Sequence, residues 1–222
     1  MIEIEQLRFA YPRSRFRLAV NEMCAAEGER IAIVGPSGTG KTTLLSLIAG
    51  LLLPAAGSVR VAGTDMTRLS DTERRRFRAR RIGFVFQDFA LLDYLTAHDN
   101  ILYPLRITDN LPLDRHARER ARALAVACGL AGKDTHYPGM LSQGEQQRVA
   151  ICRALVTQPK LILADEATGN LDPDNKQAIL DLLFERAAEV KATVIGVTHD
   201  RDLLPRFDRV IDFAAFHEAA SA

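Results

Sequence analysis

Long hydrophobic runs, closely spaced cysteines and an excess of charge of either sign are all missing from this chain of 222 residues. The longest apolar stretch, from Leu44 to Leu53, is broken by Ser46 and Gly50 and falls well short of the ~20 residues that a membrane-spanning helix needs. The first nine residues alternate apolar and polar side chains, unlike a secretory signal. We therefore expect a protein that stays in the cytoplasm and does not itself enter the membrane.

The charge balance removes another class of partner. Lysine and arginine (29) nearly equal aspartate and glutamate (28), so the net charge of +1 predicts no overall attraction to nucleic acid. Cys24, Cys128 and Cys152 show no C-x-x-C spacing, which favours small buried thiols in a reducing compartment over a metal or disulfide site. The arginine-rich stretch from Arg74 to Arg81 is interpreted as a solvated helix face or protein contact, and we expect no nucleic-acid partner.

What the chain does contain is a glycine-rich loop between an apolar strand and a helix. The segment Gly35-Pro36-Ser37-Gly38-Thr39-Gly40-Lys41-Thr42-Thr43 matches G-x-x-x-x-G-K-[ST], a phosphate-binding loop. Its glycines allow successive N–H groups to point at phosphate oxygens, and the following helix adds its positive N-terminal end. Lys41 is predicted to reach the β and γ phosphates, Thr42 to hold Mg²⁺, and Thr43 to add a hydroxyl near the phosphates.

Two carboxylates follow a second apolar strand, from Leu161 to Ala164. At the carboxyl end of a buried strand, Asp165 and Glu166 are predicted to reach the edge of the sheet where nucleotides bind. Asp165 can hold Mg²⁺ opposite Thr42, and Glu166 can accept a proton from an attacking water.

Two further residues have a predicted place at this edge. Gln87 ends the apolar strand from Ile82 to Phe86, which places its amide where α/β sheets bind ligands. Tyr11 lies in a turn, where its ring either stacks on a base or packs against Pro12.

The patterning predicts one α/β domain over residues 1–222. A parallel sheet with helices on both faces is expected beside a small antiparallel β subdomain and an inserted α-helical subdomain. The predicted core comprises residues 1–87 and 156–222, and the helical subdomain residues 88–155. Predicted strands are 2–9, 16–23, 31–34, 57–62, 82–86, 161–164, 193–197 and 209–213, and predicted helices are one that begins near Thr42 and those at 70–80, 97–105, 114–128, 143–155 and 174–190.

The residues then match a family. Leu141-Ser142-Gln143-Gly144-Glu145-Gln146-Gln147-Arg148 resembles the signature motif of ATP-binding-cassette (ABC) ATPases and precedes the Asp165–Glu166 strand at that family's spacing. The resemblance extends over essentially the whole chain. It adds Gln87 as the Q-loop glutamine, Gly169-Asn170-Leu171-Asp172 as the D-loop, His199 as the switch histidine and Tyr11 as the adenine-stacking aromatic.

This resemblance implies a P-loop NTPase with a RecA-like parallel core that hydrolyses ATP with Mg²⁺. The implied catalytic residues are Glu166, His199, Gln87 and Lys41, and the implied magnesium ligands are Thr42, Gln87 and Asp165. Two copies are expected to pair head to tail as a homodimer. In that dimer each ATP lies against Tyr11 and Gly35–Thr43 of one copy and Ser142, Gln143, Gly144 and Glu145 of the other.

The resemblance also implies membrane permease subunits as partners, contacted by about Phe89–Asn100, where Leu91, Leu92, Tyr94 and Leu95 look exposed. That contact places the protein on the inner face of the cell membrane. The nearest style is that of lipoprotein-releasing, cell-division and macrolide-efflux ATPases, which drive motions through a membrane partner. The alternatives are the cassette of a solute permease or, with less support, a non-transport ATPase of the family.

Two positions depart from the common family pattern. Gln143 stands where a second glycine is usual, and Ala167 where a proline usually follows the catalytic glutamate. Neither change removes a catalytic group, so activity is expected.

Overall fold

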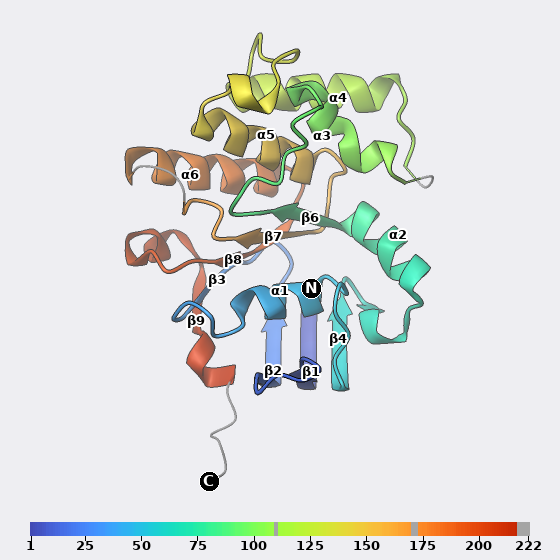
Figure 1. Ribbon diagram of the computed structural model, residues 1–222, viewed down its shortest axis with the longest axis vertical. Helices are drawn as coiled ribbons and strands as arrows, with labels where there is room; N and C mark the ends of the chain where they lie inside the picture. The colour runs from blue at the N-terminus through green and yellow to red at the C-terminus, as the bar shows by residue number, and fades with distance from the viewer. Residues whose placement is uncertain (109–110, 170–172, 217–222) are drawn as a thin grey trace.

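The computed structural model describes residues 1–108, 111–169 and 173–216, and it consists of two sheets with helices between and above them (Figure 1). The larger sheet is parallel, with five strands in the order β6-β7-β8-β3-β9, and the smaller is antiparallel, in the order β2-β1-β4-β5. The strands are β1 (Ile2–Ala10), β2 (Arg17–Ala25), β3 (Arg30–Val34), β4 (Ala56–Val61), β5 (Thr64–Asp65), β6 (Ile82–Val85), β7 (Leu161–Asp165), β8 (Thr193–Val197) and β9 (Arg209–Asp212).

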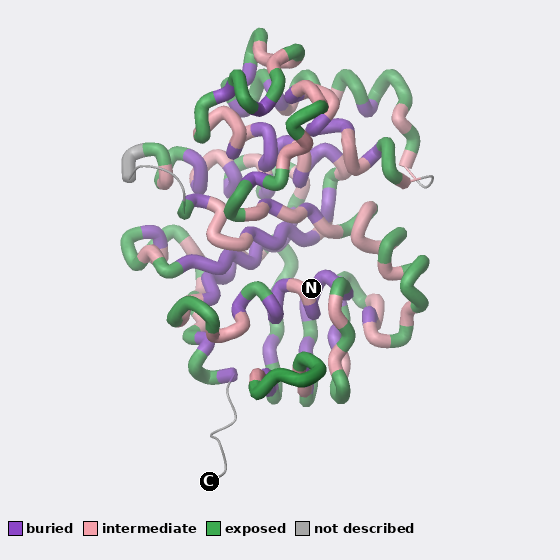
Figure 2. The backbone as a smooth tube through the Cα atoms, in the orientation of Figure 1, coloured by how far each residue is buried: buried purple, intermediate pink, exposed green. Residues whose placement is uncertain are grey.

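Burial separates the two sheets in the way their residue patterns require. All five residues of β8 and the first four of β7 are buried, as in a parallel sheet covered on both faces, whereas β1 largely alternates buried and exposed residues (Figure 2). The helices are α1 (Lys41–Ile48), α2 (Asp71–Arg81), α3 (Ala97–Arg106), α4 (Arg115–Ala127), α5 (Gln143–Leu155) and α6 (Pro173–Glu189).

Three hydrophobic clusters hold these layers together. The first joins α1 to the antiparallel sheet and to one face of the parallel sheet, through residues such as Leu44, Ile4 and Ile195. The second packs α5 and α6 on the opposite face, and the third joins α3, α4 and α5. Helix α1 and helix α5 therefore lie on opposite sides of the parallel sheet (Figure 1).

The predicted elements are present with small shifts at their ends. Helix α2 starts at a capping box, in which Ser70 Oγ accepts from the Glu73 N–H and Glu73 Oε2 accepts from the Ser70 N–H. No residue of α2 is fully buried, although Arg74 is largely covered and Arg78 donates to the Gly50 carbonyl; the choice between a solvated face and a protein contact stays open. Among the described residues, no helix combines the length and apolar character needed to cross a membrane.

The second strand begins one residue later than predicted. Arg17 is the first paired residue, opposite Ala10, and Phe16 lies outside the strand. The ring of Phe16 instead packs on the phosphate loop, where a Cβ added to Gly40 would lie 2.4 Å from Phe16 Cζ. Tertiary packing therefore takes this residue out of the ladder.

Candidate nucleotide site

The phosphate loop connects the end of β3 to the first turn of α1. Gly38 (φ 77°) and Gly40 (φ 107°) have backbone conformations that side chains disfavour, which explains the glycines at these places. Lys41 is only 6% exposed, and its Nζ donates to the carbonyl oxygens of Gly35 and Pro36, at 2.8 Å each. The lysine thus fixes the curvature of the loop and holds a buried positive charge beside it.

Threonine side chains of this segment have different partners. Thr39 Oγ1 donates to the Pro36 carbonyl at 2.9 Å, which closes the loop on itself. Thr43 Oγ1 and the Tyr11 hydroxyl lie 3.1 Å apart and share a hydrogen bond. The side chain of Thr42, which is exposed, hydrogen-bonds the Asp165 carboxylate at the end of β7.

The environment of Asp165 disfavours its ionised form, so a bound cation would stabilise this carboxylate. Burial raises its pKa and the Glu166 carboxylate adds to this, while the Thr42 hydrogen bond and the charge of Lys41 act in the opposite direction. Oxygen ligands of this kind, a hydroxyl and a carboxylate, suit Mg²⁺. The residues present therefore fit the magnesium site that the sequence predicts.

Glu166 and His199 come together after two neighbouring strands, β7 and β8. Their atoms Oε1 and Nδ1 lie 3.3 Å apart, with the carboxylate side chain 17% exposed and the imidazole 59% exposed. The backbone of Glu166 has φ 46°, and its N–H donates to the Val197 carbonyl at 3.0 Å. A left-handed conformation is unusual for a non-glycine residue, and here it turns the chain immediately after the strand.

The turn after His199 is anchored to α6. Asp200 accepts from Lys176 Nζ at 3.0 Å and from the Asp202 N–H at 3.1 Å, and its own N–H donates to Thr198 Oγ1 at 3.0 Å. The Lys176 hydrogen bond lowers the pKa of Asp200. These bonds fix the backbone from which the His199 side chain projects.

Part of the phosphate loop and Glu166 line one cavity of about 590 Å³, whereas the predicted residues Asp165 and His199 lie beside Thr42 and Glu166 without lining it. Gln87 and Glu166 both line this cavity. Their side chains also approach the same point next to Gly169: a Cβ added to that glycine would lie 3.5 Å from Gln87 Nε2 and 3.7 Å from Glu166 Oε2. The cavity is lined by Tyr11, Phe16, Ser37, Gly38, Gly40, Lys41, Thr42, Thr43, Gln87, Glu166 and Val197.

Phe16 and Val197 line the cavity although neither was predicted as a site residue, and Phe16 is the one that contributes a ring. It ends a polar turn that begins with Tyr11, and the two rings lie 5.7 Å apart between centroids. The sequence does show an apolar residue at the end of this polar turn. Because Phe16 also continues the alternation of the residues that follow it, it was predicted to be the first residue of the second strand. The cavity thus has two adjacent aromatic rings on its rim.

The predicted residues of the signature segment lie elsewhere. Ser142 is the N-cap of α5, across the parallel sheet from α1, and it does not line the 590 Å³ cavity (Figure 1). Ser142 Oγ accepts from the Glu145 N–H at 3.3 Å, while the Glu145 carboxylate accepts from the Ser142 N–H at 2.8 Å and pairs with Lys133 at 3.1 Å. Of the predicted D-loop, Asn170, Leu171 and Asp172 lie outside the described residues.

The predicted membrane-partner segment is less exposed than its sequence suggests. Of the four apolar residues named for it, Tyr94 is exposed, at 73%, whereas Leu91, Leu92 and Leu95 are half-buried. The reason is Asn100, whose buried amide accepts from the Leu92 N–H and donates to three carbonyls of residues 92–96. The expectation of several exposed apolar residues was therefore wrong in this part.

The fold and the cavity define a class: an α/β ATPase with a phosphate-binding loop and two carboxylates after a neighbouring buried strand. The family model described as ABC transporter matches residues 19–169. Since this covers more than half of the chain, the protein belongs to the ABC transporter family, as an ATP-binding subunit that hydrolyses ATP.

Relatives and solved structures agree with this assignment. The lipoprotein-releasing system ATP-binding protein LolD of Pseudomonas fluorescens is 45% identical over 193 residues, which cover 87% of this chain and 84% of that protein. The macrolide export ATP-binding/permease protein MacB of Rhodopirellula baltica is 44% identical over 83% of this chain but over 27% of its own length. The dimeric, ADP- and Pi-bound ATP-binding cassette MJ0796 superposes with a TM-score of 0.84 at 35% identity, covering 96% of this chain and 94% of that one.

Proposed function

We propose that two copies of this chain enclose two ATP molecules and drive a membrane partner of the lipoprotein-releasing type from the cytoplasmic face of the membrane. The observation that carries the ATPase half of this proposal is the Glu166–His199 pair at the edge of the cavity that holds Lys41. The similarity to LolD and MacB supports the choice of partner class.

Within one copy, the phosphate loop binds the nucleotide and the strand ends perform the chemistry. Lys41 and the loop N–H groups bind phosphate oxygens, and the Tyr11 ring offers a face for adenine. Glu166 accepts the proton of the attacking water, and His199 holds that water in line with the departing phosphate. Bound between Thr42, Asp165 and Gln87, Mg²⁺ would neutralise phosphate charge.

The other copy supplies the second half of the site. Ser142 Oγ accepts from the Glu145 N–H, and its hydroxyl also donates to the Glu145 carboxylate, a bond that it exchanges for one to a phosphate oxygen when the two copies pair. The N–H groups at the start of α5, which include that of Gly144, add an electropositive end. Because this end lies across the sheet from its own cavity, it serves the cavity of another copy; the similar MJ0796 cassette is dimeric, which supports a pairing of two copies. Gln143 and Glu145 stay predicted contacts at this end.

The central experiment is the Glu166→Gln variant. Without the proton acceptor, hydrolysis should fall by about 10²- to 10⁴-fold while ATP still binds, so ATP-bound dimers should accumulate. Size-exclusion chromatography with light scattering, with and without ATP and Mg²⁺, measures this directly. A variant that binds ATP yet stays monomeric would contradict the head-to-tail pairing.

A second experiment addresses the partner class. The proposal expects the neighbouring gene to encode a membrane protein with four transmembrane helices and a large extracytoplasmic domain, and that protein should stimulate ATP hydrolysis when reconstituted with this chain. A solute permease with six transmembrane helices in that position, with the same stimulation, would replace the lipoprotein-releasing assignment by the solute-permease alternative.

A further inference from the structure

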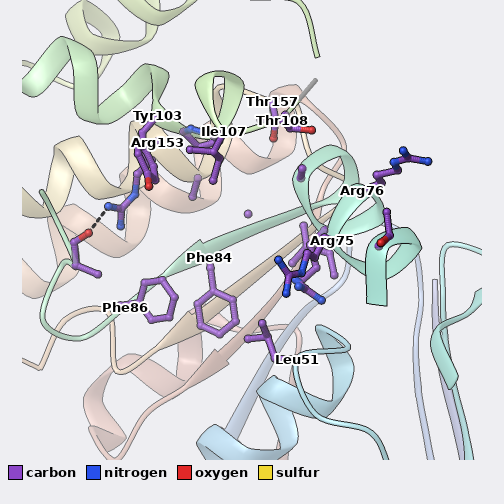
Figure 3. Close-up of a pocket in the computed structure, with 18 residues that line it drawn as sticks. Leu51, Arg75, Arg76, Phe84, Phe86, Tyr103, Ile107, Thr108, Arg153 and Thr157 are labelled. Atoms are coloured by element: carbon purple, nitrogen blue, oxygen red, sulfur yellow. Dashed lines mark hydrogen bonds between the residues drawn. The ribbon is translucent and has the colours of Figure 1, made fainter. Parts of the chain in front are cut away.

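Arg153 connects the far end of α5 to the loop that follows Gln87. Its Nη1 donates to the Ala90 carbonyl at 2.5 Å and its Nη2 donates to the Phe89 carbonyl at 2.6 Å. Figure 3 shows this side chain reaching from its helix to the loop, on one wall of a cleft of about 830 Å³ between α2 and α3. The guanidinium thus binds two successive carbonyls of one segment.

That segment has a backbone that needs support from outside. Phe89 (φ 61°) and Ala90 (φ 45°) are two consecutive non-glycine residues in the left-handed region, where side chains are disfavoured. The Phe89 N–H donates to the Phe86 carbonyl at 3.2 Å, so the turn also spans Gln87. A planar guanidinium fork matches two adjacent carbonyls, whereas a lysine ammonium cannot present the same pair of parallel donors.

The side chain of Arg153 is partly buried, and its guanidinium bonds to the carbonyls of Phe89 and Ala90. Burial lowers the pKa of the guanidinium, and the charge of Asp88 acts in the opposite direction. No salt bridge to Arg153 occurs among the residues that the structure describes. The two backbone carbonyls are accordingly its main stabilising partners.

The opposite end of α5 is the capped Ser142. It lies eleven residues before Arg153, a span of ~16 Å along an α-helix. Between them, Ile151 packs in the cluster shared with α6 and Val149 in the cluster shared with α3 and α4. A helix packed on two sides moves as one body, so a displacement at Arg153 is transmitted to Ser142.

We propose that Arg153 is a positioning residue that couples the two ATP sites of the dimer. It joins the Gln87 turn, which belongs to the cavity of its own copy, to the helix end that completes the cavity of the other copy. Nucleotide at Gln87 in one site thereby sets the position of Ser142 in the other. This coupling rests on the proposed head-to-tail dimer.

The test compares Arg153→Lys and Arg153→Met with the wild type and with a matched control, Arg120→Lys. Arg120 also donates to a backbone carbonyl, from its Nε to Val156 at 2.8 Å, but it contacts neither the Gln87 turn nor the cavity. ATP hydrolysis is measured against ATP concentration, ATP binding to the monomer is measured with radiolabelled ATP at low protein concentration, and folding is checked by thermal unfolding.

We expect a sigmoidal wild-type profile with a Hill coefficient between about 1 and 2, the limit for two sites. Both Arg153 variants should reduce it to about 1 with monomer ATP affinity within about twofold of wild type, and Arg120→Lys should leave it unchanged. A hyperbolic wild-type profile, a coefficient unaltered by Arg153→Lys, or an equal loss in Arg120→Lys would each overturn the coupling. Failure of the Glu166→Gln protein to dimerise would instead overturn the proposed dimer itself.

Discussion

The cavity edge of the parallel sheet and the N-terminus of α5 both present groups suited to phosphate, but they are built differently. At the sheet edge, Lys41 is buried and satisfied by carbonyls of its own loop, and the half-buried Asp165 lies near it. At α5, Ser142 is exposed and its backbone is satisfied by the capping box. The first region holds a buried charge within a cavity, whereas the second is a stable, exposed helix end whose first turn presents N–H groups.

This difference explains how one chain can carry half of each of two sites. The capping box satisfies the N–H groups of Ser142 and Glu145 within the helix end itself, so this end is stable on the surface before another copy arrives. The following predictions test whether the two regions have these separate roles, from the largest expected effect to the smallest.

Replacing Lys41 by methionine should nearly abolish nucleotide binding at the sheet edge. The change removes charge-assisted hydrogen bonds to phosphate worth about 3 kcal/mol, so the ATP affinity of the monomer should fall by ~100-fold or more. Equilibrium dialysis with ATP measures this. Lys160→Met, at a surface ion pair with Glu27, is the matched control and should bind ATP normally. Near-normal binding by the Lys41 variant would contradict its assigned role.

Replacing Ser142 by alanine should separate the two regions most clearly. The monomer should bind ATP as before, while ATP-driven dimer formation and hydrolysis should fall by about tenfold, because one donor to the phosphate of the other copy is lost. Chromatography of the double variant with Glu166→Gln, together with steady-state rates, gives the two readouts.

Ser70→Ala provides the control, since Ser70 caps α2 with the same capping box and lies outside the cavity. Both serine variants should lose about 1 kcal/mol of stability to urea, the usual value of an N-cap. If Ser70→Ala lowered hydrolysis as much as Ser142→Ala does, the effect would come from helix stability and not from a phosphate contact.

Replacing Gly40 by alanine should disturb the sheet edge alone. A side chain at φ 107° costs about 1–3 kcal/mol, and the new Cβ would also clash with the Phe16 ring. Removing that ring in a Gly40→Ala, Phe16→Ala double variant should relieve the clash but not the backbone strain. Urea unfolding of the single and double variants measures the two parts, and full rescue by the second change would refute the backbone argument.

Replacing Asp200 by asparagine should have the smallest effect, a loss of about 0.2–1 kcal/mol at neutral pH. The hydrogen bond from Lys176 lowers the pKa of Asp200 in the folded state. The ionised pair therefore stabilises the protein at pH values above about 3.9, the pKa of an aspartate in the unfolded chain. This stabilisation is lost as the pH falls through the pKa of Asp200 in the folded protein, which is lower. The difference in stability between wild type and variant should therefore vanish in acid. A difference that persisted below about pH 2 would show that the charge is not its cause.

Much of the cavity could be predicted because its residues are local to recognisable elements. The conformation of the loop from Gly35 to Thr43 depends mainly on its own residues. Asp165 and Glu166 follow a strand whose continuous apolar run indicates burial on both faces. Strand ends of a parallel sheet share one edge, so the convergence of Glu166 and His199 follows from the strand pattern and the family order together. The boundaries shown by the structure differ from the prediction by one or two residues.

Other features could not be read from the chain because they depend on packing between distant segments. Phe16 lies outside the predicted strand and contacts Gly40. Asn100 hydrogen-bonds the loop at Leu92, whose leucines are half-buried although the sequence suggests that they are exposed. Arg153 resembles any arginine on an amphipathic helix until its two carbonyl partners are known.

The sequence by itself determined the chemistry: a phosphate loop, two carboxylates, a histidine and a helix cap, each fixed by local backbone rules and residue type. Only the tertiary structure decided where these groups stand relative to one another. The loop from Gly35 to Thr43 and the cap at Ser142 lie on opposite sides of one sheet, because the layered packing of α1 and α5 against it buries the apolar faces of both helices.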